Sequence, residues 1–265
     1  MPHTWHIAYH SGMSSQSDLR AAIDEHVAVG LVANRISLCA RLRSLPNYLN
    51  AGGQVFVDSG AFEARRKGIQ LDWEAVFQAY EVILNMTDRP QGLSIVAPDV
   101  IGDQVETLHL WQRYSLRVQT WIDAGVRVIV PLQCGNLSAG EMLELAKRIF
   151  QRDRFTAGIP SNLDAMSPND CATLFHHDFH ILGRVAINEE LQLKLDSLLA
   201  NNPSARYTAD ANWMRSRISK IAKAVPQIHD PLKHRFASRR TRAVRAVLQE
   251  EAYSYFERFL NSVVQ

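Results

Sequence analysis

Eight short apolar runs, separated by segments of helical periodicity, constrain the fold of this chain more than any other feature. The runs are nearly continuous in apolar residues, which is typical of strands buried on both faces of a sheet. They are His6–Tyr9, Gly30–Ala33, Val55–Asp58, Leu93–Ala97, Val128–Leu132, Phe155–Gly158, His180–Gly183 and Arg206–Ala209. Strands that alternate with helices favour a parallel sheet, and eight of them predict an α/β fold of the (β/α)₈ TIM-barrel class.

The segments between the runs carry helix signals. Apolar residues form a helical stripe over Asp72–Met86, Asp103 is placed to cap a helix that runs to Asp123, and Ser138 is followed by Glu141 as in a capping box. Three further segments predict helices that begin at Ser167-Pro168, span Asn188–Leu199, or form a long terminal helix over Ala237–Val264.

The length of 265 residues suits one large barrel, and no repeat, linker or low-complexity tract divides it. We therefore expect a single domain over residues 1–265, with the barrel in about 1–213 and a basic helical extension in about 214–265. No apolar stretch approaches the roughly 18 residues of a membrane span, and the N-terminus lacks a signal-peptide core. A cytoplasmic protein without a membrane partner is expected; the sequence does not indicate an oligomeric state.

Cysteine usage argues against a disulfide framework and against a cysteine-rich zinc site. The three cysteines, Cys39, Cys134 and Cys171, lie far apart without CxxC spacing. The histidines His176, His177 and His180 cluster in the sequence, but no carboxylate or thiolate joins them at a ligand spacing. We interpret them as surface or strand-end histidines, and expect neither a metal nor a cofactor.

Charge is distributed unevenly although the net charge is only +2. Ten basic residues between 215 and 245 face a single acid, Asp230, and such a block can neutralise phosphates. The alternative interpretation is that these basic residues form the solvent-exposed face of a helix and bind nothing. The residues of this block that we predict to contact a nucleic-acid backbone are Arg215, Arg217, Lys220, Lys223, Arg239, Arg240 and Arg242.

The predicted strands end in unusually polar residues. Barrel enzymes place their chemistry at the carboxyl ends of the strands. Here the third strand ends in Asp58-Ser59-Gly60, the fourth is followed by Asp99, the fifth by Gln133, and the eighth by Asp210. An aspartate at a strand end is often a turn former, but several successive strand ends share this character. The pattern predicts carboxylates and an amide around one active site.

Six segments then resemble one known family, the tRNA-guanine transglycosylases, in the same order over roughly Gln54–Trp213. Val57–Phe62 resembles the DSGGFQ motif, Ala97–Asp99 the base-reading aspartate, and Val130–Gly135 the VQGG-type segment. The remaining resemblances are of Ala157–Ile159 to AxGG, His180–Gly183 to HxLG, and Tyr207–Trp213 to the nucleophile segment. The last is closest to the DSxSW form of relatives that insert deazaguanines into DNA.

The resemblance implies roles for individual residues. Asp210 would attack C1′ of the nucleoside and form a covalent intermediate, with Asp58 transferring protons beside it. Asp99 and Gln133 would bind the base edge, and the Gly158 N–H its carbonyl. Ser59 and Gly183 are also expected to border the base. Three aromatic residues are candidates for stacking on an extruded base, or else for the core: Phe62, Trp73 and Trp213.

Departures from the family bear on the substrate. No cysteine follows Asp210, so the zinc subdomain of the tRNA enzymes is absent or replaced, and the basic block occupies its place. Ala61 and Glu63 replace the second glycine and the glutamine of the motif. We therefore favour DNA over tRNA as the polymer, and a free purine or 7-deazaguanine as the second substrate. The alternatives are a glycosylase that uses water, a non-catalytic nucleic-acid-binding barrel, and an enzyme of small phosphorylated metabolites.

Overall fold

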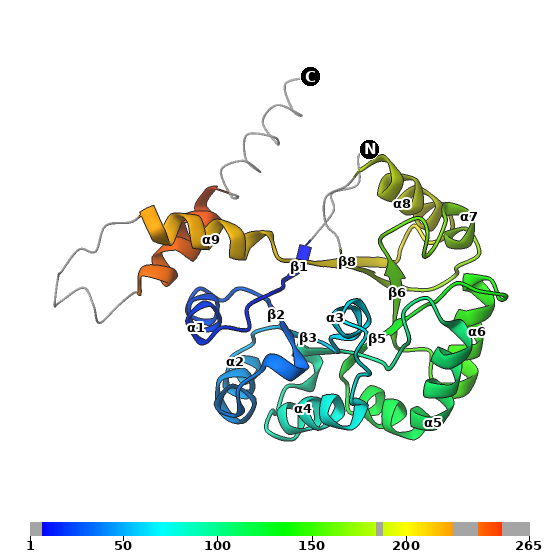
Figure 1. Ribbon diagram of the computed structural model, residues 1–265, viewed down its shortest axis with the longest axis horizontal. Helices are drawn as coiled ribbons and strands as arrows, with labels where there is room; N and C mark the ends of the chain where they lie inside the picture. The colour runs from blue at the N-terminus through cyan, green and yellow to red at the C-terminus, as the bar shows by residue number, and fades with distance from the viewer. Residues whose placement is uncertain (1–6, 184–187, 225–237, 251–265) are drawn as a thin grey trace.

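A closed barrel of eight parallel strands forms the centre of the molecule (Figure 1). The computed structural model describes residues 7–183, 188–224 and 238–250. The strands are β1 (Ile7–His10), β2 (Val29–Val32), β3 (Val55–Asp58), β4 (Leu93–Val96), β5 (Arg127–Pro131), β6 (Thr156–Pro160), β7 (Asp178–Leu182) and β8 (Arg206–Ala211). Each lies within two residues of its predicted bounds, so the (β/α)₈ barrel is confirmed.

Helices fill the connections and surround the strands (Figure 1). They are α1 (Gln16–Asp24), α2 (Leu45–Asn50), α3 (Ala61–Arg66), α4 (Trp73–Asn85), α5 (Gln104–Asp123), α6 (Ala139–Phe150), α7 (Pro168–Cys171), α8 (Glu189–Asn201) and α9 (Trp213–Ala224), with short turns η1 (Ala33–Arg35), η2 (Ala40–Ser44) and η3 (Pro90–Gly92). The predicted caps are confirmed: Asp103 accepts a backbone N–H bond at the start of α5, and Ser138 and Glu141 form a capping box. Asp72, the first residue of the predicted helical stripe, also caps α4 by accepting the Ala75 N–H.

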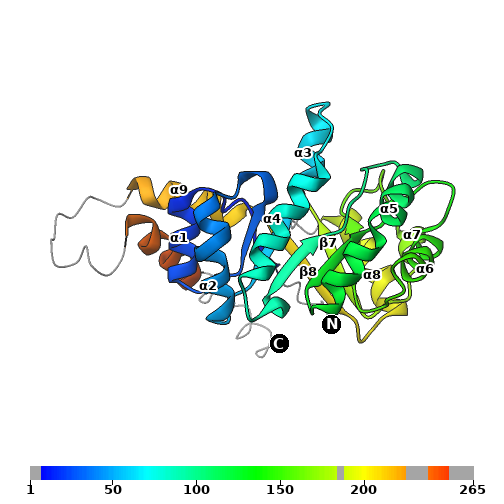
Figure 2. The ribbon, with the colours of Figure 1, turned by 90° about the horizontal axis from the view of Figure 1, so that it is seen from below.

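Helix α3 was not predicted from the sequence. It has only six residues, and its N-cap is Gly60, which has no side chain to cap the helix and adopts a φ of 86°. A Cβ at this position would lie 2.9 Å from Val32 Cγ1, so both the backbone angle and the space favour glycine. The helix projects away from the rest of the molecule (Figure 2).

The alternation of side chains along each strand decides which residues enter the barrel. In β3, Val55 and Val57 belong to the large core beneath the helices. Phe56 instead joins a separate small cluster, with Tyr9 of β1 and Ile129 of β5, in the barrel interior. Because Asp58 shares the parity of Phe56, its carboxyl group points inward at the carboxyl end of the strand.

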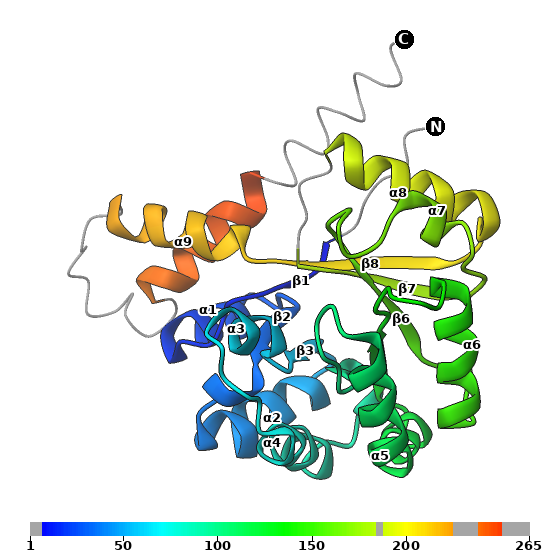
Figure 3. The same cartoon turned by 45° about the vertical axis from the view of Figure 1, so that its right-hand side comes forward.

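The C-terminal extension lies beside α1, as Figure 3 shows for α9 and the helical segment at residues 239–250. Thr241 Oγ1 bonds to Asp24 Oδ2 at 3.1 Å, and Arg245 to Glu25 Oε1 at 2.6 Å. The predicted terminal helix Ala237–Val264 is confirmed over residues 239–250; its remaining residues lie outside the described part. Among the described helices, none has the length and apolar character needed to cross a membrane.

Candidate active site

Three aspartates reach the same end of the barrel. Asp58 is the last residue of β3, Asp99 follows β4 by three residues, and Asp210 is the penultimate residue of β8. Because all strands are parallel, their carboxyl ends form one rim. The charge of Asp210 raises the pKa of Asp58, and the charge of Asp58 raises that of Asp99, so the three form one electrostatic group.

Asp58 is held as a carboxyl group that titrates near neutrality. Burial, and then the negative charge of Asp210, raise its pKa to about 6, although the backbone N–H groups of Gly60 and Ser59 act in the opposite direction. Ser59 is buried and its Oγ accepts the Ala61 N–H at 3.2 Å. The turn Asp58-Ser59-Gly60 therefore fixes a carboxyl group that can both give and take a proton at neutral pH.

Asp99 and Gln133 form a buried polar pair. Gln133 Nε2 donates to Asp99 Oδ2 at 3.0 Å, and Gln133 Oε1 accepts the Gly102 N–H at 2.8 Å, which fixes the orientation of the amide. Burial and the charge of Asp58 raise the pKa of Asp99 to about 7. One oxygen of Asp99 and one N–H of Gln133 are not used in these bonds, so the pair can offer an acceptor and a donor side by side.

Gln104, the first residue of α5, holds this pair in place and was missed in the sequence. Its Nε2 donates to the backbone oxygens of Gln133 and Leu137 at 2.9 and 3.0 Å, and its Oε1 accepts the Leu137 N–H at 2.9 Å. The side chain is buried. A glutamine directly after the N-cap Asp103 is an ordinary helix-start residue, so its sequence position gave no signal of this role.

Asp210 differs from the other two aspartates because its ionised form is stabilised. Burial would raise its pKa, but His180, the Gly183 N–H and the Ser11 hydroxyl outweigh that effect and leave the pKa below its usual value. His180 Nε2 lies 3.5 Å from Asp210 Oδ1, and the Gly183 N–H donates to the same oxygen at 3.4 Å. Gly183 has a φ of 85°, a conformation in which glycine is favoured.

His180 connects Asp210 to the opposite end of the barrel. The ring is fully buried, and burial lowers its pKa, so it is neutral at pH 7. Its Nδ1 lies 2.9 Å from Thr208 Oγ1, which accepts a hydrogen bond from Arg127 Nη2 at 2.8 Å. Sequence reasoning places His180 in a strand and among three clustered histidines, but it assigns the side chain no role beside Asp210. His180 lies on the same face of β7 as Asp178 and Leu182, and this period of two is the signal that places it inside the barrel.

The amino-terminal end of the barrel is closed by an ion-pair cluster. Asp178 binds Arg127 at 2.8 Å and Arg206 at 2.6 Å, and accepts the Thr156 hydroxyl at 2.6 Å. Burial opposes its ionisation, but these bonds dominate and lower the pKa of Asp178 to about 2. We made no prediction for this cluster, whose four members are the first residues of β5, β6, β7 and β8.

Gly158 and the three aromatic candidates differ in how the barrel places them. Gly158 lies within β6, aligned with Pro131 and His180 on the neighbouring strands, and a Cβ there would lie 3.1 Å from Pro131 Cα. Its predicted contact with a base stays a prediction. Of the aromatic candidates, Phe62 is 70% exposed on α3, whereas Trp73 packs on Phe77 with ring centroids 5.7 Å apart. The side chain of Trp213 lies outside the described part.

Several arginines of the basic block form ion pairs with acids. Arg215 lies 3.7 Å from Asp18, Arg240 also pairs with Asp18, and Arg217 pairs with Glu250. These contacts hold α9 and residues 239–250 to each other and to α1. Lys220 is exposed, while Arg239 and Arg242 are half-buried. Nothing is described for the side chain of Lys223. Binding of phosphates by this block stays a prediction.

The clustered histidines do not converge. His176 Nε2 bonds to the Phe155 carbonyl at 2.8 Å, and its ring centroid lies 4.3 Å from that of His177, whereas His180 lies inside the barrel. Within residues 7–183, 188–224 and 238–250, no group of three or more His, Cys, Asp or Glu side chains is arranged to hold a metal ion.

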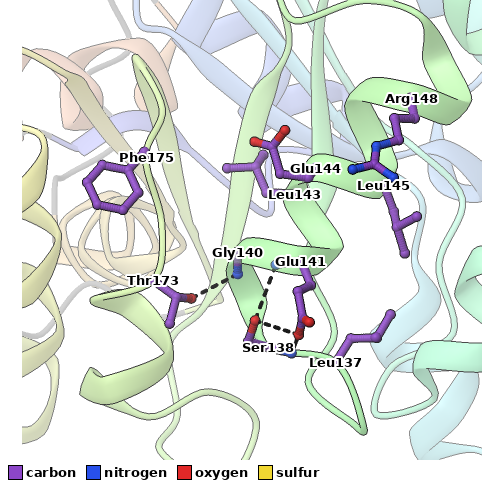
Figure 4. A pocket seen from close by; sticks show the side chains of 10 residues that line it. All are labelled: Leu137, Ser138, Gly140, Glu141, Leu143, Glu144, Leu145, Arg148, Thr173 and Phe175. Carbon is purple, nitrogen blue, oxygen red and sulfur yellow. Dashed lines mark hydrogen bonds between the residues drawn. The ribbon is translucent and has the colours of Figure 1, made fainter.

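A surface groove of about 530 Å³ lies apart from the aspartates (Figure 4). It is formed by the first turns of α6 and by Thr173 and Phe175, which follow α7. Thr173 Oγ1 accepts the Gly140 N–H at 2.9 Å across the groove. None of the predicted site residues lines it.

Comparison with known proteins supports the fold alone. No protein-family model matches the chain, and no curated protein matches its sequence. Among solved structures, it is similar to a Coccidioides immitis protein described as a fructose-1,6-biphosphate aldolase, with a TM-score of 0.54 and 12% identity over 93% of this chain and 88% of the other. A xylose isomerase-like TIM barrel/4-hydroxyphenylpyruvate dioxygenase fusion protein gives a TM-score of 0.44 and 9% identity, over 77% of this chain and 39% of the other.

Proposed function

We propose that this protein cleaves the N-glycosidic bond between base and sugar in a nucleic acid, with Asp210 as the carboxylate that faces the sugar. The observation that carries the proposal is that three aspartates meet at one rim of the barrel with pKa values pushed apart. Asp210 is stabilised as an anion, whereas the pKa values of Asp58 and Asp99 are raised to about 6 and about 7. Neighbouring carboxyl groups with pKa values pushed apart are a mark of acid–base pairs in enzymes.

The chemistry of glycosidic cleavage needs both states. The sugar becomes cationic as the bond breaks, and an ionised carboxylate stabilises or captures it. An Asp210 oxygen forms a bond to C1′ while the bond from C1′ to the base nitrogen breaks. The departing base takes a proton from Asp58, whose raised pKa leaves it partly protonated near neutral pH.

The second half-reaction restores the protein. An incoming free base attacks C1′ through its ring nitrogen, gives the proton of that nitrogen to Asp58, and releases Asp210 as a carboxylate. The resemblance to deazaguanine transglycosylases leads us to propose a 7-deazaguanine as this base and DNA as the polymer. Asp99 and Gln133 suit recognition of a guanine-like edge, since together they offer an acceptor and a donor.

The test is incubation of the protein with a DNA duplex and, separately, with tRNA, each with and without labelled 7-deazaguanine. Label incorporation identifies base exchange, and abasic sites without incorporation identify a hydrolytic glycosylase. Asp99→Asn should change which base is accepted, because an acceptor facing the base becomes partly a donor. Absence of base release from both polymers under all conditions would reject the proposal in favour of a non-catalytic barrel.

A further inference from the structure

A second set of basic side chains lies on the rim of the barrel itself. The α3 rim consists of Arg35, Phe62, Arg65, Arg66 and Lys67, from η1 after β2 and from α3 with the residue after it. All five are exposed. Arg35 and Lys67 both pair with Glu63, so one carboxylate serves two cations. Within the described part of the chain, Arg65 and Arg66 form no ion pair with a carboxylate.

The α3 rim is tied to the candidate active site at two points. Helix α3 begins directly after the turn Asp58-Ser59-Gly60. A Cβ on Gly102 would lie 2.8 Å from Arg65 Nη1, so the guanidinium rests against the glycine whose N–H binds Gln133. A polymer that contacted these cations would therefore pass immediately beside Asp58 and Asp99.

The composition of the rim matches one kind of occupant. Exposed cations attract phosphates, and an exposed aromatic ring among them can stack on a base. Phe62 is 70% exposed on the same short helix as Arg65 and Arg66. An acidic side chain is also present, but Glu63 is already shared between Arg35 and Lys67. The net positive charge of the rim thus remains on Arg65 and Arg66, of which Arg65 lies against Gly102 beside the active site.

We infer that the α3 rim holds the phosphodiester backbone of the DNA strand that presents its base to the active site. The inference rests on the proposed function, and it gives the basic block around α9 a lesser part in binding. Arg65 and Arg66 bind phosphates as cations, without reading sequence, and they orient the strand so that one nucleotide faces Asp210 and Asp58.

The test compares two double variants with the same change in charge. Arg65→Ala with Arg66→Ala removes the unpaired cations of the rim. Arg113→Ala with Arg148→Ala removes exposed arginines from α5 and α6, far from the rim along the chain. Binding of a fluorescent DNA oligonucleotide is measured by anisotropy between about 50 and about 200 mM salt. Because binding is measured without chemistry, it is independent of catalysis.

Loss of the rim cations should weaken DNA binding about tenfold and reduce the slope of log affinity against log salt by about 1.8, since each phosphate contact contributes about 0.9. The control variant should keep the wild-type slope. Arg65→Lys with Arg66→Lys should also keep it, because charge suffices for phosphate binding. This variant separates a lost charge from a damaged fold.

The possible failures are distinct. If the wild-type protein releases bases but the rim variant binds DNA with the wild-type slope, the inference is wrong and the proposed function stands. If the wild-type protein binds DNA through the rim but releases no base, the proposed function is wrong and the binding surface stands. If the control variant loses as much slope as the rim variant, binding is diffuse and the rim has no special part.

Discussion

The two ends of the barrel hold buried aspartates in opposite electrostatic settings. At the amino-terminal end, Asp178 binds two arginines and a hydroxyl, and its pKa falls to about 2. At the carboxyl end, Asp58 and Asp99 form no ion pair within the described part of the chain, and their pKa values rise to about 6 and about 7. A buried carboxylate that is paired with cations is compatible with a stable fold. A buried carboxyl group without such a partner lowers the stability of the fold, but it is useful where a proton must be transferred.

The largest difference between the ends should appear in activity. Asp210→Asn keeps the shape of the side chain and removes its charge, so single-turnover base release should fall roughly 10⁴-fold or more. The fold should be retained, because a neutral amide is no harder to bury than a carboxylate. The measurement includes a trap for a covalent protein–DNA adduct. Near wild-type release by this variant would show that Asp210 is not the nucleophile.

Removal of the charge at the other end should damage stability instead. Asp178→Asn leaves Arg127 buried without its counter-ion, and breaking such a pair costs about 3–5 kcal/mol of unfolding free energy. Denaturant unfolding measures this loss. Asp123→Asn is the matched control, because the pair of Asp123 with Arg152 is exposed and should contribute little. Equal effects of the two variants would contradict the distinction between the ends.

The pH dependence of stability should reveal both the raised pKa values at the carboxyl end and the lowered pKa at the amino-terminal end. Asp58 and Asp99 have raised pKa values in the folded state, so between about pH 4 and 7 the folded protein binds protons that the unfolded chain releases. Stability should therefore fall across this window: raising the two pKa values from 3.8 to about 6 and about 7 corresponds to roughly 3 kcal/mol for Asp58 and roughly 4 kcal/mol for Asp99. Asp178 acts in the opposite sense, because its pKa is lowered in the folded state. Its contribution to the free energy of unfolding is present above about pH 4 and is lost as the pH falls towards 2.

Asp99→Asn sharpens this test, because it removes one of the two titrations. The variant should lose less stability than the wild type between about pH 4 and 7, and it should keep the acid limb that Asp178 produces. Urea unfolding at a series of pH values gives the comparison. A wild-type profile that is flat or rises across the window would mean that the two carboxyl groups are not held in their protonated form.

The sequence predicted the strands and the aspartates of the site better than the residues that hold those aspartates in place. Apolar runs identify strands that are buried on both faces of a sheet. The barrel and the positions of Asp58, Asp99 and Asp210 at the strand ends therefore followed from the sequence pattern alone. The partners of these aspartates come from elements distant in the chain. Gln104 acts through three-dimensional contacts that no local spacing records. The period of β7 could have placed His180 inside the barrel, but its approach to Asp210 depends on how two neighbouring strands pack.

The basic extension shows the same limit. Its charge was evident in the sequence, but acids that pair with several of its arginines lie far away in the chain. They are Asp18 in α1, Glu25 directly after it, and Glu250, each more than 30 positions from its arginine. Formal charge therefore overstated the charge that is free to bind phosphate. The α3 rim has fewer basic residues, yet two of its arginines have no carboxylate partner in the described part of the chain.

The smallest effect we predict concerns the connection between the two ends. The Thr208 hydroxyl proton has two acceptors in reach, His180 Nδ1 at 2.9 Å and the Phe179 carbonyl at 3.2 Å. When Thr208 donates this proton to His180 Nδ1, neutral His180 carries its own proton on Nε2. Nε2 is the ring atom that lies 3.5 Å from Asp210 Oδ1. Arg127 donates to the oxygen of the same hydroxyl, so we expect the ion-pair cluster at one end to favour this tautomer beside Asp210 at the other.

Thr208→Val removes the hydroxyl at nearly constant volume, and His180 is then no longer held in that tautomer. Base release should fall about tenfold, equivalent to one hydrogen bond of about 1.4 kcal/mol, and the acid limb of its pH profile should move to higher pH because Asp210 is less stabilised as an anion. Thr208→Ser should restore both the rate and the profile. A purely structural role would lower stability in Thr208→Val and leave the pH profile in place, which would make the two ends of the barrel independent.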